Sequence, residues 1–146
     1  MSQAVSPSIP SSPTSVASGL ARLALVAAAL ATALAALWLL STVATVLPAR
    51  DPGRVPFWTA VAIALLAYSA LSLGAAWRGP RSGWLRLALL WASVAAMFVG
   101  GFEVAENLSP RPGGHFEGYL VLLGAIVAAH GIVAVAWIAG RRVRRT

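Results

Sequence analysis

The chain contains no cysteine, no lysine and few charged residues of any kind. The absence of cysteine excludes disulfide bonds, thiol catalysis and metal sites built on thiolates. Charged residues make up 10% of the chain, whereas about 25% is typical of soluble domains. The only acids in the 146 residues are Asp51, Glu103, Glu106 and Glu117. This composition argues against a disordered chain and against an ordinary soluble enzyme.

Long apolar runs make up most of what is present, and hydrophobic residues account for 59% of the chain. About 20 apolar residues in a helix cross the hydrocarbon core of a bilayer, which is roughly 30 Å thick. Within a domain at 20–140, the sequence predicts four such helices, at about 23–47, 57–77, 84–107 and 117–140. The expected fold is therefore an all-α, polytopic membrane protein with four transmembrane helices in an up-down bundle.

Proline and serine mark the segments outside the helices. All nine prolines lie outside the four apolar runs, as expected for a residue that breaks helices. The loops between the runs are short, which favours antiparallel neighbours. Residues 1–19 form an uncharged Ser/Pro-rich tail that we expect to be disordered. Residues 141–146 form a short basic tail.

The arginines predict an orientation in the membrane. Eight arginines lie on one side: Arg22 before the first run, Arg78, Arg81 and Arg86 around the second loop, and Arg141, Arg142, Arg144 and Arg145 in the C-terminal tail. Three lie on the other side, in the first and third loops: Arg50, Arg54 and Arg111. We expect the protein in the inner membrane of a bacterial cell. Because cytoplasmic loops carry the excess of basic residues, both termini are expected on the cytoplasmic side. We attribute the formal net charge of +7 to the basic loops that set this orientation. We therefore expect no nucleic-acid partner. Trp77, Trp84 and Trp137 are expected in the aromatic belt at the inner interface.

A polar cluster is predicted at the outer end of the third helix. Glu103, Glu106 and Asn107 have i, i+3 and i+4 spacing, which places them on one helix face. His115 and Glu117 follow on the same side of the membrane. Three carboxylates, an imidazole and an amide can bind a divalent cation. The alternative is a solvated interfacial group whose acids are neutralised by arginines of the outer loops.

Glu103 differs from the other acids because it continues a stripe of small residues, Ala96 and Gly100. Small residues four apart let membrane helices approach closely, so Glu103 is expected to face protein rather than lipid. The same spacing occurs at Ala70/Gly74 and at Gly124/Ala128. A carboxylate in a helix contact is a candidate site for a proton or cation, and an ion pair with an outer arginine is the alternative.

His130 lies deep in the fourth run and is a second candidate site, together with Tyr68 near the middle of the second. Intramembrane ionisable residues are functional candidates. A structural alternative is a neutral imidazole that bonds to Tyr68, Ser69, Ser72 or Ser93. Tyr68, Trp38 and Trp91 are also candidates to line a pocket for a lipid-like ligand.

The sequence favours a non-enzymatic role over catalysis. It contains no Walker loop, nucleophile elbow or HExxH motif, and it identifies neither a metal nor a cofactor. We expect an accessory, assembly or structural subunit that lies in the lipid bilayer and pairs with other membrane proteins or with a second copy. The alternatives are an oligomeric proton- or cation-coupled transporter or channel that uses Glu103, and a membrane enzyme for a lipid-soluble substrate.

Overall fold

The computed structural model describes residues 13–78, 83–108 and 118–142. Four long helices follow one another in this part of the chain, and a short helix and a 3-10 turn join the first two. The elements are α1 (Pro13–Thr45), α2 (Leu47–Arg50), η1 (Pro52–Arg54), α3 (Val55–Arg78), α4 (Gly83–Leu108) and α5 (Gly118–Arg142). The described residues contain no strand, and the four long helices are long and apolar enough to cross a membrane. The predicted all-α class and four membrane-spanning helices are confirmed.

The ends of α1 differ from the predicted run. The helix starts at Pro13, inside the tail that we expected to be disordered, and proline is well suited to the first position of a helix. Residues 1–12 lie outside the described part. At the other end α1 stops at Thr45, and the last bond runs from the Val46 N–H to the Thr42 carbonyl, at 2.9 Å. The chain turns here because Pro48 has no N–H to continue the ladder.

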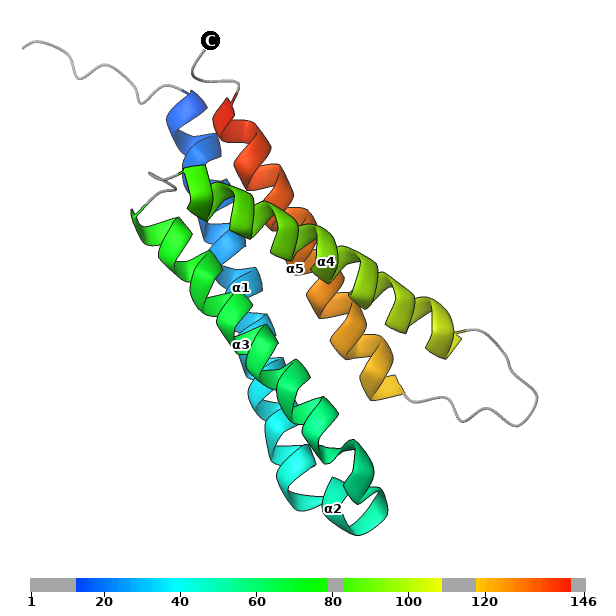
Figure 1. The fold of residues 1–146 in the computed structure, drawn as a ribbon. Coiled ribbons are helices and arrows are strands. Elements are labelled where there is room, and N and C mark those ends of the chain that lie inside the picture. Colours follow the sequence, from blue (N-terminus) through cyan, green and yellow to red (C-terminus); the bar gives the residue numbers. More distant parts are fainter. Residues whose placement is uncertain (1–12, 79–82, 109–117, 143–146) are drawn as a thin grey trace, which may run out of the picture.

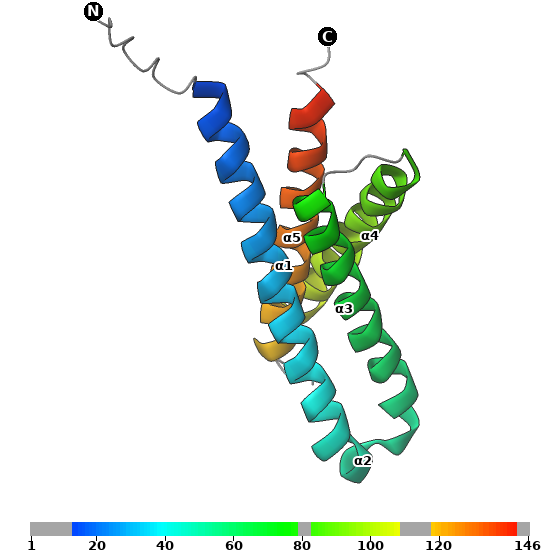
Figure 2. The same cartoon turned by 90° about the vertical axis from the view of Figure 1, so that its left-hand side faces the viewer.

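The four long helices form two antiparallel hairpins. Helix α1 pairs with α3, and α4 pairs with α5. Helix α1 also lies against α5, whereas α3 and α4 contact each other only over a short stretch. The two hairpins separate toward the end that carries α2, as Figure 1 shows. Figure 2 places the start of α1 and the end of α5 at the opposite end of the bundle. We call these the α2 end and the terminal end.

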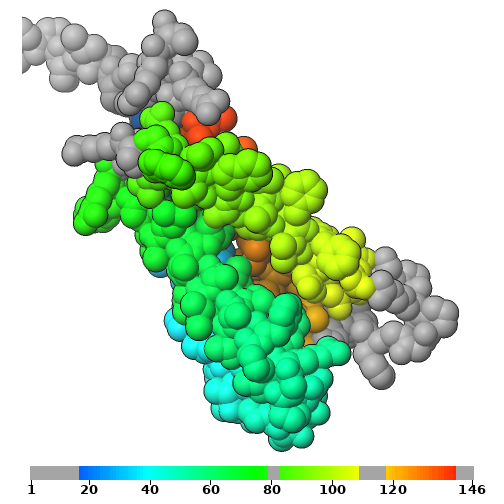
Figure 3. All heavy atoms as spheres, in the orientation of Figure 1, coloured from blue at the N-terminus to red at the C-terminus, as the bar shows by residue number. Residues whose placement is uncertain are grey.

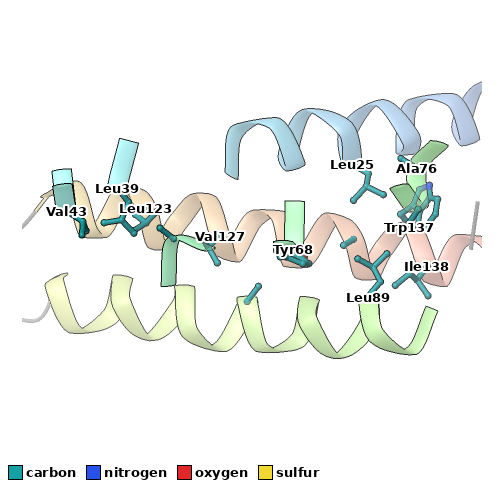
Figure 4. Packing of buried hydrophobic residues seen from close by; sticks show 14 residues of the cluster. Leu25, Leu39, Val43, Tyr68, Ala76, Leu89, Leu123, Val127, Trp137 and Ile138 are labelled. Carbon is teal, nitrogen blue, oxygen red and sulfur yellow. The ribbon is translucent and has the colours of Figure 1, made fainter. Parts of the chain in front are cut away.

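The core is a narrow seam with a regular spacing on α1. Its buried positions alternate four and three residues apart: Leu25, Ala29, Thr32, Ala36, Leu39 and Val43. This is the heptad spacing of helices that pack side by side. Figure 4 shows the buried apolar side chains along α5, with Leu39, Val43 and Leu123 toward one end and Leu25, Trp137 and Ile138 toward the other.

The closest contact between helices joins α4 and α5 at glycines. A Cβ atom on Gly100 would collide with the carbonyl oxygen of Gly124, and one on Gly124 would lie 2.7 Å from the carbonyl oxygen of Gly100. Two of the three predicted small-residue pairs, Ala96/Gly100 and Gly124/Ala128, therefore lie at this contact. The third, Ala70/Gly74 on α3, faces outward.

The aromatic belt at the terminal end is only partly as predicted. Trp77 and Trp84 are exposed, by 82% and 81%. Trp137 is only 3% exposed, so its assignment to the belt was wrong. It follows His130 by seven residues, which is two turns of helix, and thus lies on the same buried face of α5.

Candidate functional site

A cluster of polar side chains lies in the middle of the bundle, and every long helix contributes to it. Its members are Thr32 on α1, Tyr68 and Ser72 on α3, Ser93 on α4, and His130 on α5. All five are buried. We call this group the central polar cluster. In a bilayer it would lie among hydrocarbon, where polar groups are costly unless they bond to one another.

His130 is the centre of this cluster, and both nitrogens of its ring are bonded. The Nδ1 atom lies 2.9 Å from the hydroxyl oxygen of Thr32. The Nε2 atom lies 3.0 Å from the hydroxyl oxygen of Ser72. A neutral imidazole has one donor and one acceptor, and each hydroxyl can take either role. The imidazole is therefore fully satisfied, and it joins α5 to both α1 and α3.

Tyr68 extends the cluster from α3 to α4. Its hydroxyl donates to the Ser93 hydroxyl at 3.0 Å, and Ser93 donates in turn to the Leu89 carbonyl at 2.6 Å. The phenol ring packs on the His130 imidazole, with ring centres 4.2 Å apart and planes inclined by 31°. Tyr68 thus makes a polar contact with α4 and an aromatic contact with α5.

Helix register and a glycine bring these groups together. Tyr68 and Ser72 lie one turn apart on α3, so both face the same side. Gly131, next to His130, lets α5 lie directly against α4, since a Cβ atom there would stand 2.6 Å from the Ser93 carbonyl oxygen. This close approach packs α5 on the segment of α4 that carries Ser93.

The sequence identified most of the cluster but not all of it. Ser72 bonds to His130, Tyr68 packs on it, and Ser93 bonds to Tyr68 rather than to the imidazole. Ser69 donates to the Leu65 carbonyl of its own helix, at 2.9 Å. Thr32 was missed, although it is the only hydroxyl-bearing residue between Leu23 and Leu40. A lone hydroxyl in so long an apolar run was the signal that could have found it.

Trp38 and Trp91 do not belong to the bundle core. Their side chains are 50% and 67% exposed on the outer surface of α1 and α4. Trp38 contacts Tyr119 of α5 edge to face, with ring centres 5.9 Å apart. Tyr68 is buried, and its hydroxyl is already bonded to Ser93. These three rings therefore do not together line a pocket for a lipid-like ligand.

The second candidate site lies near the C-terminal end of α4. The Asn107 side-chain amide donates to the Glu103 carbonyl oxygen at 2.8 Å and lies 3.3 Å from the Glu103 carboxylate. Glu103, Glu106 and Asn107 are all partly buried. His115 and Glu117 lie outside the described residues. Within the described ranges, no group of three or more His, Asp or Glu residues is arranged to hold a metal ion.

Glu103 borders an apolar cleft between α3 and the α4–α5 hairpin. The cleft has a volume of about 80 Å³. Its apolar walls come from α3 (Phe57, Trp58, Val61, Leu65), α4 (Val99, Gly100) and α5 (Leu120, Leu123, Gly124, Val127). Figure 3 shows the opening between α3 and α4, with α5 visible behind it. Glu103 is the only charged residue among those that line this cleft.

The two candidate sites occupy different levels of the bundle. Ser93 of the central polar cluster precedes Glu103 by ten residues on α4, which corresponds to a rise of about 15 Å. The acid therefore stands toward the α2 end, and the imidazole lies near the middle.

Comparisons with known proteins found no match for the chain. No protein-family model matches it, and neither the curated proteins nor the solved structures contain a significant match.

Proposed function

We propose that this protein is a non-enzymatic subunit of a membrane complex, and that it packs against a partner's transmembrane helix through the outward face of α3. The observation that carries the proposal is the composition of that face. Five of its exposed positions hold small residues: Ala60, Ala64, Ala67, Ala70 and Gly74. We call this the small-residue face.

The outward surfaces of α1 and α4 are built differently. Between Phe57 and Trp77, Ile63 is the only large apolar side chain that is exposed on α3. By contrast, α1 and α4 expose bulky side chains at many positions along their length: Leu30, Leu34, Leu37 and Trp38 on α1, and Trp91, Phe98, Val99 and Phe102 on α4. Bulky apolar side chains suit contact with lipid tails, whereas small residues let another helix approach closely.

The α4–α5 contact shows what such residues do in this chain. There the glycines bring two helix backbones together with no space for a Cβ atom. At Gly74 the same substitution would meet no atom within 4 Å. The small-residue face therefore has the composition of a helix contact without a helix against it in the monomer.

The central polar cluster supports a structural role for His130 and Tyr68, the candidate intramembrane site. Both nitrogens of His130 are bonded to hydroxyls, and the described residues contain no buried side-chain nitrogen or oxygen without a hydrogen-bond partner. The central polar cluster then holds the two hairpins together, and the small-residue face packs against the partner's helix.

The test replaces small residues on α3 and measures the size of the native assembly. Ala67→Leu combined with Gly74→Leu should shift the tagged protein, extracted in a mild detergent, from a larger complex to the free chain on a native gel. Ala95→Leu is the matched control, because Ala95 is exposed on α4. A second copy carrying a different tag separates self-association from association with another protein.

Three results would contradict the proposal. One is a wild-type protein that runs as a free chain when extracted from its own membranes. Another is an assembly that survives the double substitution while the variant remains folded by circular dichroism. Loss of the assembly in Ala95→Leu as well would show that the small-residue face is not the contact.

A proton- or cation-coupled transporter is the second candidate, and one observation favours it. Glu103 borders a cleft that is otherwise apolar and is lined by three different helices. A carboxylate at such a place can exchange a proton or bind a cation as the helices move.

A further inference from the structure

The α2 end contains a second cavity, distinct from the apolar cleft. Its volume is about 220 Å³. Apolar side chains of α1, α3 and α5 line one part, and the chain around α2 and η1 supplies charged groups. The polar lining residues are Thr42, Arg50, Asp51, Arg54 and Tyr119. We call this space the arginine cavity.

The charge of the arginine cavity favours an anion. Arg54 already pairs with Asp51, with its Nε atom 3.0 Å from the carboxylate. Asp51 is the only acid among the lining residues. The two arginines and one acid leave an excess positive charge among the lining residues. Guanidinium groups bind phosphate through several parallel N–H donors.

The level of the cavity matches that of a lipid headgroup. It lies where the α1 and α3 spans meet, between Thr45 and Val55, at the boundary of the apolar segments. Trp58 and Tyr119 line it, and these amphipathic rings favour the membrane–water interface.

The arginine cavity and the apolar cleft are neighbours. Trp58 and Leu120 line both of them. The cleft leads away from the cavity along α3 and α5 and opens on the outer surface between α3 and α4 (Figure 3). A polar space thus adjoins an apolar cleft, which is the arrangement that a phosphate and its hydrocarbon chain need.

We propose that the α2 end binds one anionic phospholipid, with the phosphate in the arginine cavity at Arg50 and Arg54 and one acyl chain in the apolar cleft. Glu103 borders the acyl-chain portion and bonds to Asn107, so its charge stands on the cleft side rather than among the cavity-lining residues. The lipid fills the space left where the two hairpins separate. This proposal does not depend on the subunit proposal, because it concerns a different surface.

The test measures lipid binding to the purified full-length protein, freed of lipid in a neutral detergent, by native mass spectrometry. Dioleoyl phosphatidylglycerol should be retained several-fold more strongly than dioleoyl phosphatidylcholine. Arg50→Gln should lower the affinity for phosphatidylglycerol about fivefold, since one basic residue near the headgroups contributes about 1 kcal/mol. Arg78→Gln, at the terminal end of α3, is the matched control and should leave the affinity unchanged.

A second pair of variants tests the acyl chain. Val99→Trp should fill the cleft and lower phosphatidylglycerol binding, whereas Ala95→Trp, elsewhere on the exposed surface of α4, should not. Equal retention of the two lipids would overturn the proposal. So would an unchanged affinity in a folded Arg50→Gln variant. Glycerol 3-phosphate that competes as strongly as the lipid would show an anion site without a chain site, and would also overturn it.

Discussion

The imidazole of His130 on α5 lies 3.0 Å from the hydroxyl of Ser72 on α3, two residues that are 58 positions apart in the chain. The other ring nitrogen binds Thr32 on α1. One side chain thus joins the α4–α5 hairpin to both helices of the α1–α3 hairpin. In a bilayer, where apolar surfaces have little reason to prefer one another over lipid, such bonds help to select one arrangement of helices.

Replacing His130 should loosen the contact between the two hairpins. We expect His130→Ala to lower the free energy of unfolding by about 1–3 kcal/mol, because two buried hydroxyls lose their partner and a cavity remains. The measurement is unfolding of the purified protein in mixed micelles with increasing denaturing detergent. An unchanged midpoint would mean that the central polar cluster does not hold the hairpins together.

The Thr32–His130 bond can be isolated with a matched pair of threonines. Thr32→Val should cost about 0.6 kcal/mol and at most about 1.7 kcal/mol, the average and the maximum for side-chain hydrogen bonds between membrane helices. Thr59→Val is the control, because the Thr59 hydroxyl bonds only to the Val55 carbonyl of its own helix. In the His130→Ala background the Thr32→Val cost should largely vanish. Additive effects of the two substitutions would contradict a direct bond.

The glycines should respond to alanine in opposite ways. At Gly124 a Cβ atom would stand 2.7 Å from the Gly100 carbonyl oxygen, so Gly124→Ala should destabilise the protein by about 1–3 kcal/mol. Gly74→Ala meets open space and should be neutral in the monomer or stabilise α3 by up to about 1 kcal/mol. Thermal unfolding of both variants checks this, and a stable Gly124→Ala protein would refute the close α4–α5 contact.

Glu103 decides between the subunit and the transporter. If the protein is a subunit, Glu103→Gln should change stability by at most about 0.5 kcal/mol, as expected for a partly exposed site, and should leave the assembly intact. If it is a proton-coupled transporter, proton influx into proteoliposomes under an imposed potential should be present in the wild type and lost in Glu103→Gln. Glu106→Gln is the control. A larger effect of Glu106→Gln would show that Glu103 does not lie on the face of α4 that packs against protein.

The arginine balance predicts that both termini lie in the cytoplasm. Reporter fusions after Thr146 and within the Pro52–Arg54 turn should therefore report opposite sides of the membrane, with the C-terminal fusion inside. A C-terminal fusion that is active outside would reverse the orientation, and would place the arginine cavity in the inner leaflet.

The existence of four helices was predictable because charge and proline interrupt the apolar runs. Pro48 marks the end of α1 within a few residues. The long uncharged runs exclude most other folds. The pairing of helices was not predictable in the same way. On α1 the outward Leu34 and Leu37 are as apolar as the buried Leu39, because lipid is as apolar as the core and leaves no polar face to read.

The candidate sites were predictable in proportion to how rare their residues are. His130 stands out as a lone imidazole in an apolar run, and Glu103 as an acid behind a small-residue stripe. Thr32 is equally rare, as the lone hydroxyl of its run, but its bond to His130 depends on a partner 98 residues away. The burial of Trp137 likewise depends on which helices pack against α5. The adjoining cavities at the α2 end depend on how far the hairpins separate, which no local pattern encodes.

Photocrosslinking within intact membranes tests the subunit proposal without extraction by detergent. A photoreactive benzoylphenylalanine placed at Ala67 on the small-residue face should give a discrete crosslinked protein product. The same group placed at Ala95 on α4 should give mainly lipid adducts. If Ala67 yields no protein product, or if Ala95 yields the same product with equal efficiency, the outward face of α3 does not serve as the contact with a partner.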